Sequence, residues 1–226
     1  DRSQEVHKVT YKNAKGQTIV GLLNRTFTAK RRAPVVLIPT AFSRRKESTV
    51  GLALTLVENF RRNLQHVAVL RFDYTNAVGE SDKDEGCDTE GREYLHYSTS
   101  NTIADLRASF DFLADNRFVE ASDVILISFS LNSLTARTLL ADTSRTHPVS
   151  YWIAPMGVAD AQDAIKNCSG DIDYVGDYSR NISHGAANIL GSIVDMDQYC
   201  ADLVNLNAAT LGDARRAMNL IDVPVT

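Results

Sequence analysis

The fold is decided by residues 124–132, which read V-I-L-I-S-F-S-L-N. The first four residues form a continuous apolar run, which is typical of a strand buried on both faces of a parallel sheet. Leucines then recur at helical spacing through residues 131–142, so a helix is expected there. The sequence therefore places Ser130 at a tight turn from a buried strand into a helix.

The rest of the first two thirds of the chain repeats this alternation. Three further apolar runs predict buried strands, at residues 34–39, 67–72 and 149–156. Amphipathic stretches between them predict helices at residues 49–62 and 102–116. Strands that alternate with helices in this order indicate a mostly parallel sheet flanked by helices, so the predicted fold class is α/β.

The two ends of the chain follow other patterns. Residues 5–12 and 17–27 alternate loosely around a short turn, which predicts an antiparallel hairpin. Residues 157–220 contain no buried-strand run and only short polar-rich helical pieces, such as 159–167 and 198–219. The predicted organisation is a core at 1–156, a helical cap or lid at 157–222, and the start of a further core strand at 223–226.

Composition excludes several classes of protein. The chain has 226 residues, of which 44% are apolar and 23% charged, and its formal net charge is −4, as in ordinary globular proteins. No apolar run approaches the roughly 18 residues that a membrane-spanning helix needs. The three cysteines form no C-x-x-C pair, which favours a reducing, cytoplasmic location and argues against structural zinc. We expect no metal or organic cofactor.

The charges are distributed unevenly along the chain. Residues 1–62 hold 13 basic and four acidic side chains, and the acidic surplus lies in the remainder. A basic surface that includes Arg44, Arg45 and Lys46 could help to dock an acidic partner, although a merely solvated surface is the simpler explanation. Nucleic acid is not expected as a partner, because no aromatic residues interleave with the basic ones.

The turn at Ser130 has the position of a nucleophile elbow. Such a turn exposes a serine hydroxyl at the start of a helix, whose N-terminus favours developing negative charge. The usual pattern is G-x-S-x-G, and here Ser128 and Asn132 stand in place of the two glycines. The alternative is that Ser130 only caps the helix that follows.

Two other loops follow predicted strands at the same sheet edge. The loop after residues 34–39 is where hydrolases of this architecture place one oxyanion-hole donor, here the backbone N–H of Phe42 or Ala41. The second donor would be the N–H of Leu131. Asp73, after the next strand, is expected to hold its loop through backbone hydrogen bonds and not to act as a catalytic acid.

Taken in order, these motifs resemble those of the α/β-hydrolase superfamily. Within it the chain is most similar to the bacterial luminescence acyltransferases, which are fatty acyl-ACP thioesterases. The resemblance is carried by residues 40–45, which read T-A-F-S-R-R, by 71–74 and 79–81, and by S-F-S-L at 128–131. It implies an α/β-hydrolase fold and cleavage of a fatty acyl thioester or ester through an acyl-Ser130 intermediate. A fatty acyl carrier protein would be the donor, an acceptor enzyme could follow, and the product would supply fatty acid or aldehyde.

The resemblance also implies a catalytic acid and a histidine that follow the cap. The chain ends at Thr226, inside the strand that should precede the acid, so neither residue is expected within it and the C-terminal strands are expected to be missing. None of the five histidines is a good substitute. Two alternatives stay open: a serine hydrolase of another specificity, such as a carboxylesterase, lipase or peptidase, and a non-catalytic binding module.

Overall fold

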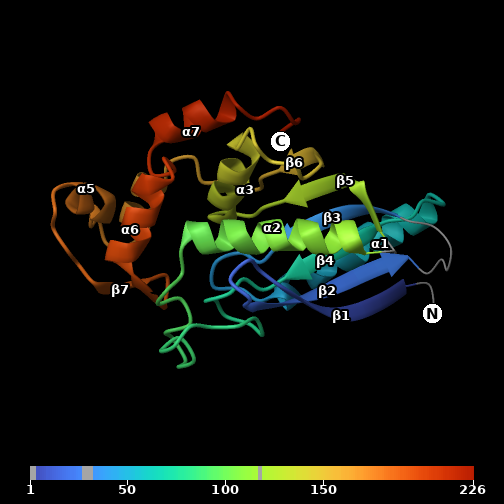
Figure 1. The fold of residues 1–226 in the computed structure, drawn as a ribbon, viewed down its shortest axis with the longest axis horizontal. Helices are drawn as coiled ribbons and strands as arrows, with labels where there is room; N and C mark the ends of the chain where they lie inside the picture. The colour runs from blue at the N-terminus through green and yellow to red at the C-terminus, as the bar shows by residue number, and fades with distance from the viewer. Residues whose placement is uncertain (1–3, 27–32, 117–118) are drawn as a thin grey trace.

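A computed structural model describes residues 4–26, 33–116 and 119–226 of the chain. It contains a six-stranded sheet with the strand order β1-β2-β4-β3-β5-β6 (Figure 1). The strands are β1 (Gln4–Lys12), β2 (Thr18–Thr26), β3 (Ala33–Pro39), β4 (Ala68–Phe72), β5 (Val119–Ile127) and β6 (Val149–Ile153). The predicted α/β class is confirmed.

Parallel and antiparallel pairing divide the sheet as the sequence patterns predict. β1 and β2 form the predicted antiparallel hairpin, although residue 27 of the predicted second strand lies outside the described residues. β2 pairs antiparallel with β4, and the strands from β4 through β3 and β5 to β6 are parallel. The carboxyl ends of four parallel strands therefore meet at one edge, where ligands bind in open α/β sheets.

Helices bury both faces of the parallel strands. They are α1 (Val50–Arg62), which follows the short 3-10 helix η1 (Lys46–Thr49), α2 (Thr99–Asp115) and α3 (Asn132–Ala141). Val36 and Ile38 of β3 pack in one apolar cluster with α1, whereas Val35 and Leu37 pack in a second cluster that includes α2 and α3. A strand with a helix on each face has no polar side, which explains the uninterrupted apolar runs.

Residues beyond β6 lie beyond the carboxyl ends of the strands and over α3 (Figure 1). Their elements are α4 (Ala161–Cys168), α5 (Tyr174–Ser179), β7 (Ala186–Ile189), β8 (Ser192–Asp195), α6 (Met196–Asn205) and α7 (Leu211–Met218). The expectation of helical pieces alone is wrong here, because β7 and β8 form an antiparallel hairpin. The predicted helix at 198–219 is two helices, and Thr210 begins the second with a capping box.

The last described residues lie beside β6. Val225 forms a parallel bridge with Trp152. The Trp152 N–H donates to the Pro224 carbonyl at 3.0 Å, and the Thr226 N–H donates back to the Trp152 carbonyl at 3.0 Å. Residues 224–226 thus continue the parallel sheet next to its edge strand.

Candidate active site

Ser130 lies at the turn between β5 and α3 in a backbone conformation that few side chains adopt. Its φ is 51°, in the left-handed region. The turn is held against the end of β6, because the Ser128 N–H donates to the Ile153 carbonyl at 2.9 Å and the Ser130 N–H donates to the Pro155 carbonyl at 3.1 Å. Strained residues that the surrounding structure holds in place are concentrated at functional sites.

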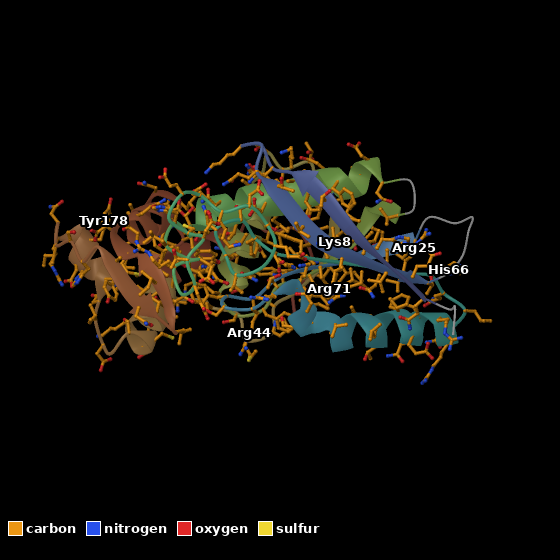
Figure 2. All side chains as sticks on the ribbon, turned by 90° about the horizontal axis from the view of Figure 1, so that it is seen from below. Lys8, Arg25, Arg44, His66, Arg71 and Tyr178 are labelled. Atoms are coloured by element: carbon orange, nitrogen blue, oxygen red, sulfur yellow. The ribbon has the colours of Figure 1, made fainter. Side chains whose placement is uncertain are left out.

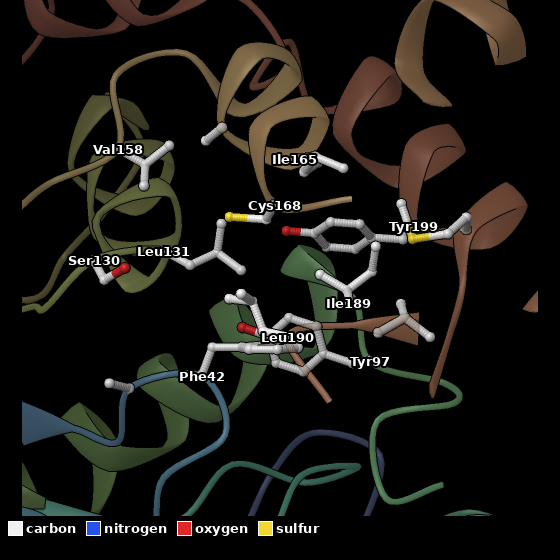
Figure 3. A pocket seen from close by; sticks show the side chains of 14 residues that line it. Phe42, Tyr97, Ser130, Leu131, Val158, Ile165, Cys168, Ile189, Leu190 and Tyr199 are labelled. Carbon is white, nitrogen blue, oxygen red and sulfur yellow. The ribbon is translucent and has the colours of Figure 1, made fainter. Parts of the chain in front are cut away.

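Ser130 lies before the residue that caps α3. α3 begins after Leu131, which caps it without any side-chain hydrogen bond, so the alternative that Ser130 only caps this helix is not met. The side chain of Ser130 points into a cavity beyond the sheet edge (Figure 3). Behind it, the N-terminus of α3 places a positive helix-dipole end near the hydroxyl.

The two residues that replace glycines have roles of their own. The hydroxyl of Ser128 is fully buried and accepts a hydrogen bond from the Trp152 indole N–H at 2.7 Å. The buried Asn132 amide donates to the Thr40 carbonyl, in the loop after β3. Asn132 therefore joins the serine turn directly to the loop that is expected to supply an oxyanion donor.

Free backbone donors line the same cavity as Ser130. Ala41, Phe42 and Leu131 all contribute to its wall. Among the described residues, the backbone N–H groups of these three find no hydrogen-bond acceptor, whereas the next N–H, that of Ser43, donates to the Tyr94 hydroxyl at 2.8 Å. Unpaired N–H groups beside a serine hydroxyl are what stabilisation of an oxyanion requires.

A buried ion pair holds the other end of the 40–46 loop. Asp73 accepts hydrogen bonds from the Lys46 backbone N–H at 2.7 Å and from its Nζ at 2.8 Å, and from the Glu80 N–H at 3.0 Å. Arg71 Nη1 donates to the Lys46 carbonyl at 2.7 Å. The prediction that Asp73 holds its loop is confirmed.

Lys46 does not belong to a docking surface. Its side chain is 1% exposed, and Nζ also reaches Glu80 Oε2 at 2.6 Å. Burial lowers the pKa of Lys46, but the hydrogen bonds that its Nζ donates to Asp73 and Glu80 offset this and raise the pKa above its ordinary value. The prediction that Lys46 offers its charge to a partner is therefore wrong, because its buried ammonium group is already paired with Asp73 and Glu80.

Arg44 and Arg45 are exposed, as the docking prediction requires. Arg45, however, lines a shallow groove that also contains Asp88, Glu90 and Glu93. These carboxylates reduce the positive potential that an acidic partner would meet.

The cavity at Ser130 is apolar and has a volume of about 130 Å³. The loops and helices of the core form one wall, and the residues beyond β6 form the other (Figure 3). The Tyr97 ring packs edge-on against Phe42, with centroids 5.4 Å apart, and at a tilt against Tyr199, with centroids 5.9 Å apart. The remaining lining residues are Val158, Ala164, Ile165, Cys168, Ile189, Leu190, Val194 and Met196. The lining residues that follow β6 were not predicted, because nothing in the sequence indicates how that part of the chain folds back over the sheet edge.

No histidine or carboxylate lines this cavity in the described part of the chain. His66 precedes β4 and lies at the far end of the molecule from Tyr178 of α5 (Figure 2). The others have partners elsewhere: His7 contacts Glu5, His96 contacts Gln198, His147 stacks on Phe110, and His184 contacts Asp177. None of these contacts brings a histidine to the wall of the Ser130 cavity in the described residues.

Several solved structures resemble this chain in fold. An acetyl xylan esterase from Paenibacillus sp. R4 superposes with a TM-score of 0.65 at 12% identity, over 99% of this chain and 76% of the esterase. The thioesterase domain from the curacin biosynthetic pathway gives 0.59 at 14% identity, over 98% and 81%. The alpha/beta hydrolase GrgF from Penicillium sp. sh18 gives 0.56 at 16% identity, over 95% and 73%.

The chain has the α/β-hydrolase fold. No protein-family model matches the sequence, and no curated protein matches it significantly. At these identities the similarity establishes the fold alone. Proteins that share a fold can catalyse unrelated reactions, so the fold does not identify the reaction. What the chain does is therefore decided by the residues of its site.

Metal-binding groups and membrane-spanning helices are both absent from the described residues. No group of His, Cys, Asp and Glu side chains within residues 4–26, 33–116 and 119–226 is arranged to hold a metal ion. Over the same ranges, no helix combines the length and apolar character needed to cross a bilayer.

Proposed function

We propose that this chain carries the nucleophile and oxyanion hole of a serine acyl hydrolase. The observation that supports it most is that the Ser130 hydroxyl, at a strained strand-to-helix turn, shares a cavity with unpaired N–H groups of Phe42 and Leu131. A helix cap or a packing serine would need neither the strain nor the free donors.

The geometry supports acyl transfer in two steps. Ser130 Oγ attacks the carbonyl carbon and gives its proton to a base, while the N–H groups of Leu131 and Phe42 hold the oxyanion. The alcohol or thiol then leaves with a proton, and water cleaves the acyl-serine ester. Loss of one oxyanion donor typically costs about 3–4 kcal/mol of transition-state stabilisation.

The proposal includes a requirement for a general base. Because the histidines at positions 7, 66, 96, 147 and 184 all have partners away from Ser130, we propose that the acid and the histidine of the triad lie outside these 226 residues. A non-catalytic module that binds an acyl group remains the alternative, and the absence of a base at the cavity in the described chain favours it.

The apolar cavity supports an ester or thioester whose acyl part is hydrocarbon. More specifically, we propose a role like that of the luminescence acyltransferases. An acyl carrier protein would donate the acyl group, and the product would supply fatty acid or aldehyde. Arg44 and Arg45 would be the contacts for that acidic donor. Serine hydrolases of other specificities use the same kind of site, so the two possibilities are distinguished by which substrates the protein cleaves.

The experiment compares acyl-carrier-protein thioesters with simple 4-nitrophenyl esters on the natively expressed protein. We expect both to be cleaved, and we expect the Ser130→Ala variant, matched in fold by circular dichroism, to be inactive on both. If the protein prefers the carrier thioester and loses this preference as the salt concentration rises, the result supports an acyltransferase that docks an acidic carrier protein. Activity that survives in Ser130→Ala contradicts the proposal.

A further inference from the structure

Leu190 occupies an unusual position at the mouth of the cavity. It lies at the tip of the β7–β8 hairpin and is 62% exposed, yet its side chain lines the same apolar cavity as Ser130 and Phe42 (Figure 3). A large apolar side chain left exposed beside a candidate nucleophile is buried further when an apolar group enters the cavity, and that burial is favourable.

The turn at this tip is a poor place for leucine. Leu190 and Gly191 are the two central residues of a two-residue hairpin turn, with φ of 53° and 87°. Positive φ at both positions is the type I′ geometry, which strongly favours asparagine or glycine at the first of them. Leu64, at the end of α1, has a similar φ of 57° and is 93% exposed, but it lies away from the cavity.

The hairpin is fixed relative to the reacting groups. The Ser192 hydroxyl lies 2.9 Å from that of Ser43, the residue that follows Phe42 in the oxyanion loop. On the other side, the Ile193 N–H donates to the Gly91 carbonyl at 3.0 Å. The tip is thus held at a set distance from the oxyanion loop and not left as a loose surface turn.

We propose that Leu190 is a specificity-determining residue that packs on the acyl group of the substrate, and that this group contains about six carbons, because a cavity of roughly 150 Å³ holds a benzene-sized ligand. The cavity here has about 130 Å³. This inference rests on the proposed function for the position of the acyl carbonyl at Ser130. A long fatty acyl chain would have to extend past Leu190 into solvent.

The test is the chain-length profile of 4-nitrophenyl esters, from acetate through hexanoate to dodecanoate, for the wild type and two variants. Leu190→Asn supplies the residue that the turn prefers and removes the apolar contact. Leu64→Asn is the matched control, since it relieves the same backbone conformation away from the cavity. Thermal unfolding of both variants establishes that they are folded, and we expect neither to melt below the wild type.

We expect the wild type to have its highest kcat/KM on hexanoate, and Leu190→Asn to lower the ratio of hexanoate to acetate activity about tenfold, as loss of one apolar contact in a pocket does. Leu64→Asn should leave that ratio unchanged. A ratio unchanged in Leu190→Asn, or a wild-type optimum at dodecanoate, overturns the inference while leaving the proposed function intact.

A binding measurement separates failure of this inference from failure of the proposed function. Calorimetric titration compares hexanoate with acetate on the same proteins. If the wild type cleaves no ester but binds hexanoate more tightly than acetate, and Leu190→Asn removes that difference, the acyl site stands and the hydrolase proposal falls. If the wild type cleaves no ester and binds neither hexanoate nor acetate, both the role of Leu190 and the proposed function are wrong.

Discussion

At the scale of single residues, the serine turn is built without the glycines that usually flank it. Ser128 accepts from the Trp152 indole, and Asn132 donates to Thr40, so both positions carry a side chain that the local packing uses. Ser130 itself could be predicted from the sequence, because its signal is local: a buried strand, a serine and a helix. The bond from Asn132 to Thr40 could not, because it joins residues 92 positions apart.

Replacing Asn132 by glycine tests whether this bond supports the site. We expect Asn132→Gly to lower the free energy of unfolding by about 1 kcal/mol, the usual net value of one hydrogen bond. Hydrolysis should slow more than stability alone explains, because the 40–46 loop loses its link to the serine turn. Chemical denaturation and ester kinetics measure the two effects.

The control is Asn207→Gly, at an exposed asparagine with a φ of 50°, where glycine fits without strain. Asn207→Gly should change neither the free energy of unfolding nor the rate of ester hydrolysis. If Asn132→Gly is as stable and active as the wild type, the asparagine merely fills the space that a glycine would leave.

At the scale of elements, the 40–46 loop depends on a buried ion pair. Lys46 and Asp73 are 1% and 0% exposed, and together they fix the loop end whose other end supplies Phe42. The sequence indicated that Asp73 would hold a loop, because it follows a buried strand. It did not indicate that Lys46 would be its partner, since a lysine in a run of basic residues is normally exposed.

Replacing Lys46 by methionine should destabilise the protein strongly. Lys46→Met leaves the Asp73 carboxylate buried without its cation, and breaking such a pair costs about 3–5 kcal/mol. Lys8→Met is the matched control, because Lys8 pairs with Glu80 at the surface, where both side chains are about half exposed. Urea unfolding of the two variants measures the difference. Equal stability of the two would mean that the buried pair contributes no more than a surface one.

The β7–β8 hairpin illustrates what sequence patterns miss at this scale. Its strands read A-A-N-I and S-I-V-D, and its turn lacks the Asn-Gly signature that marks short hairpins. The strands are held partly by bonds to the distant 89–98 loop, such as that from the Asp195 N–H to the Leu95 carbonyl. No local window of sequence contains that information.

At the scale of the whole molecule, the fold is more predictable than the site. Four apolar runs alternating with amphipathic helices were enough to predict the α/β class, because burial of β3, β4, β5 and β6 between helices leaves a strong pattern. The cavity depends on how the residues beyond β6 pack over Ser130, which no local pattern encodes. The solved structures that share this fold include esterases and a thioesterase domain, and they leave the choice between enzyme and binding module to experiment.

The most direct test of the central claim is intact-mass spectrometry of the natively expressed protein before and after reaction with a fluorophosphonate probe. We predict a single adduct, located on Ser130 by peptide mapping and absent from Ser130→Ala. A folded protein that gains no adduct, or one that is still labelled in the Ser130→Ala variant, would contradict the assignment of Ser130 as the nucleophile.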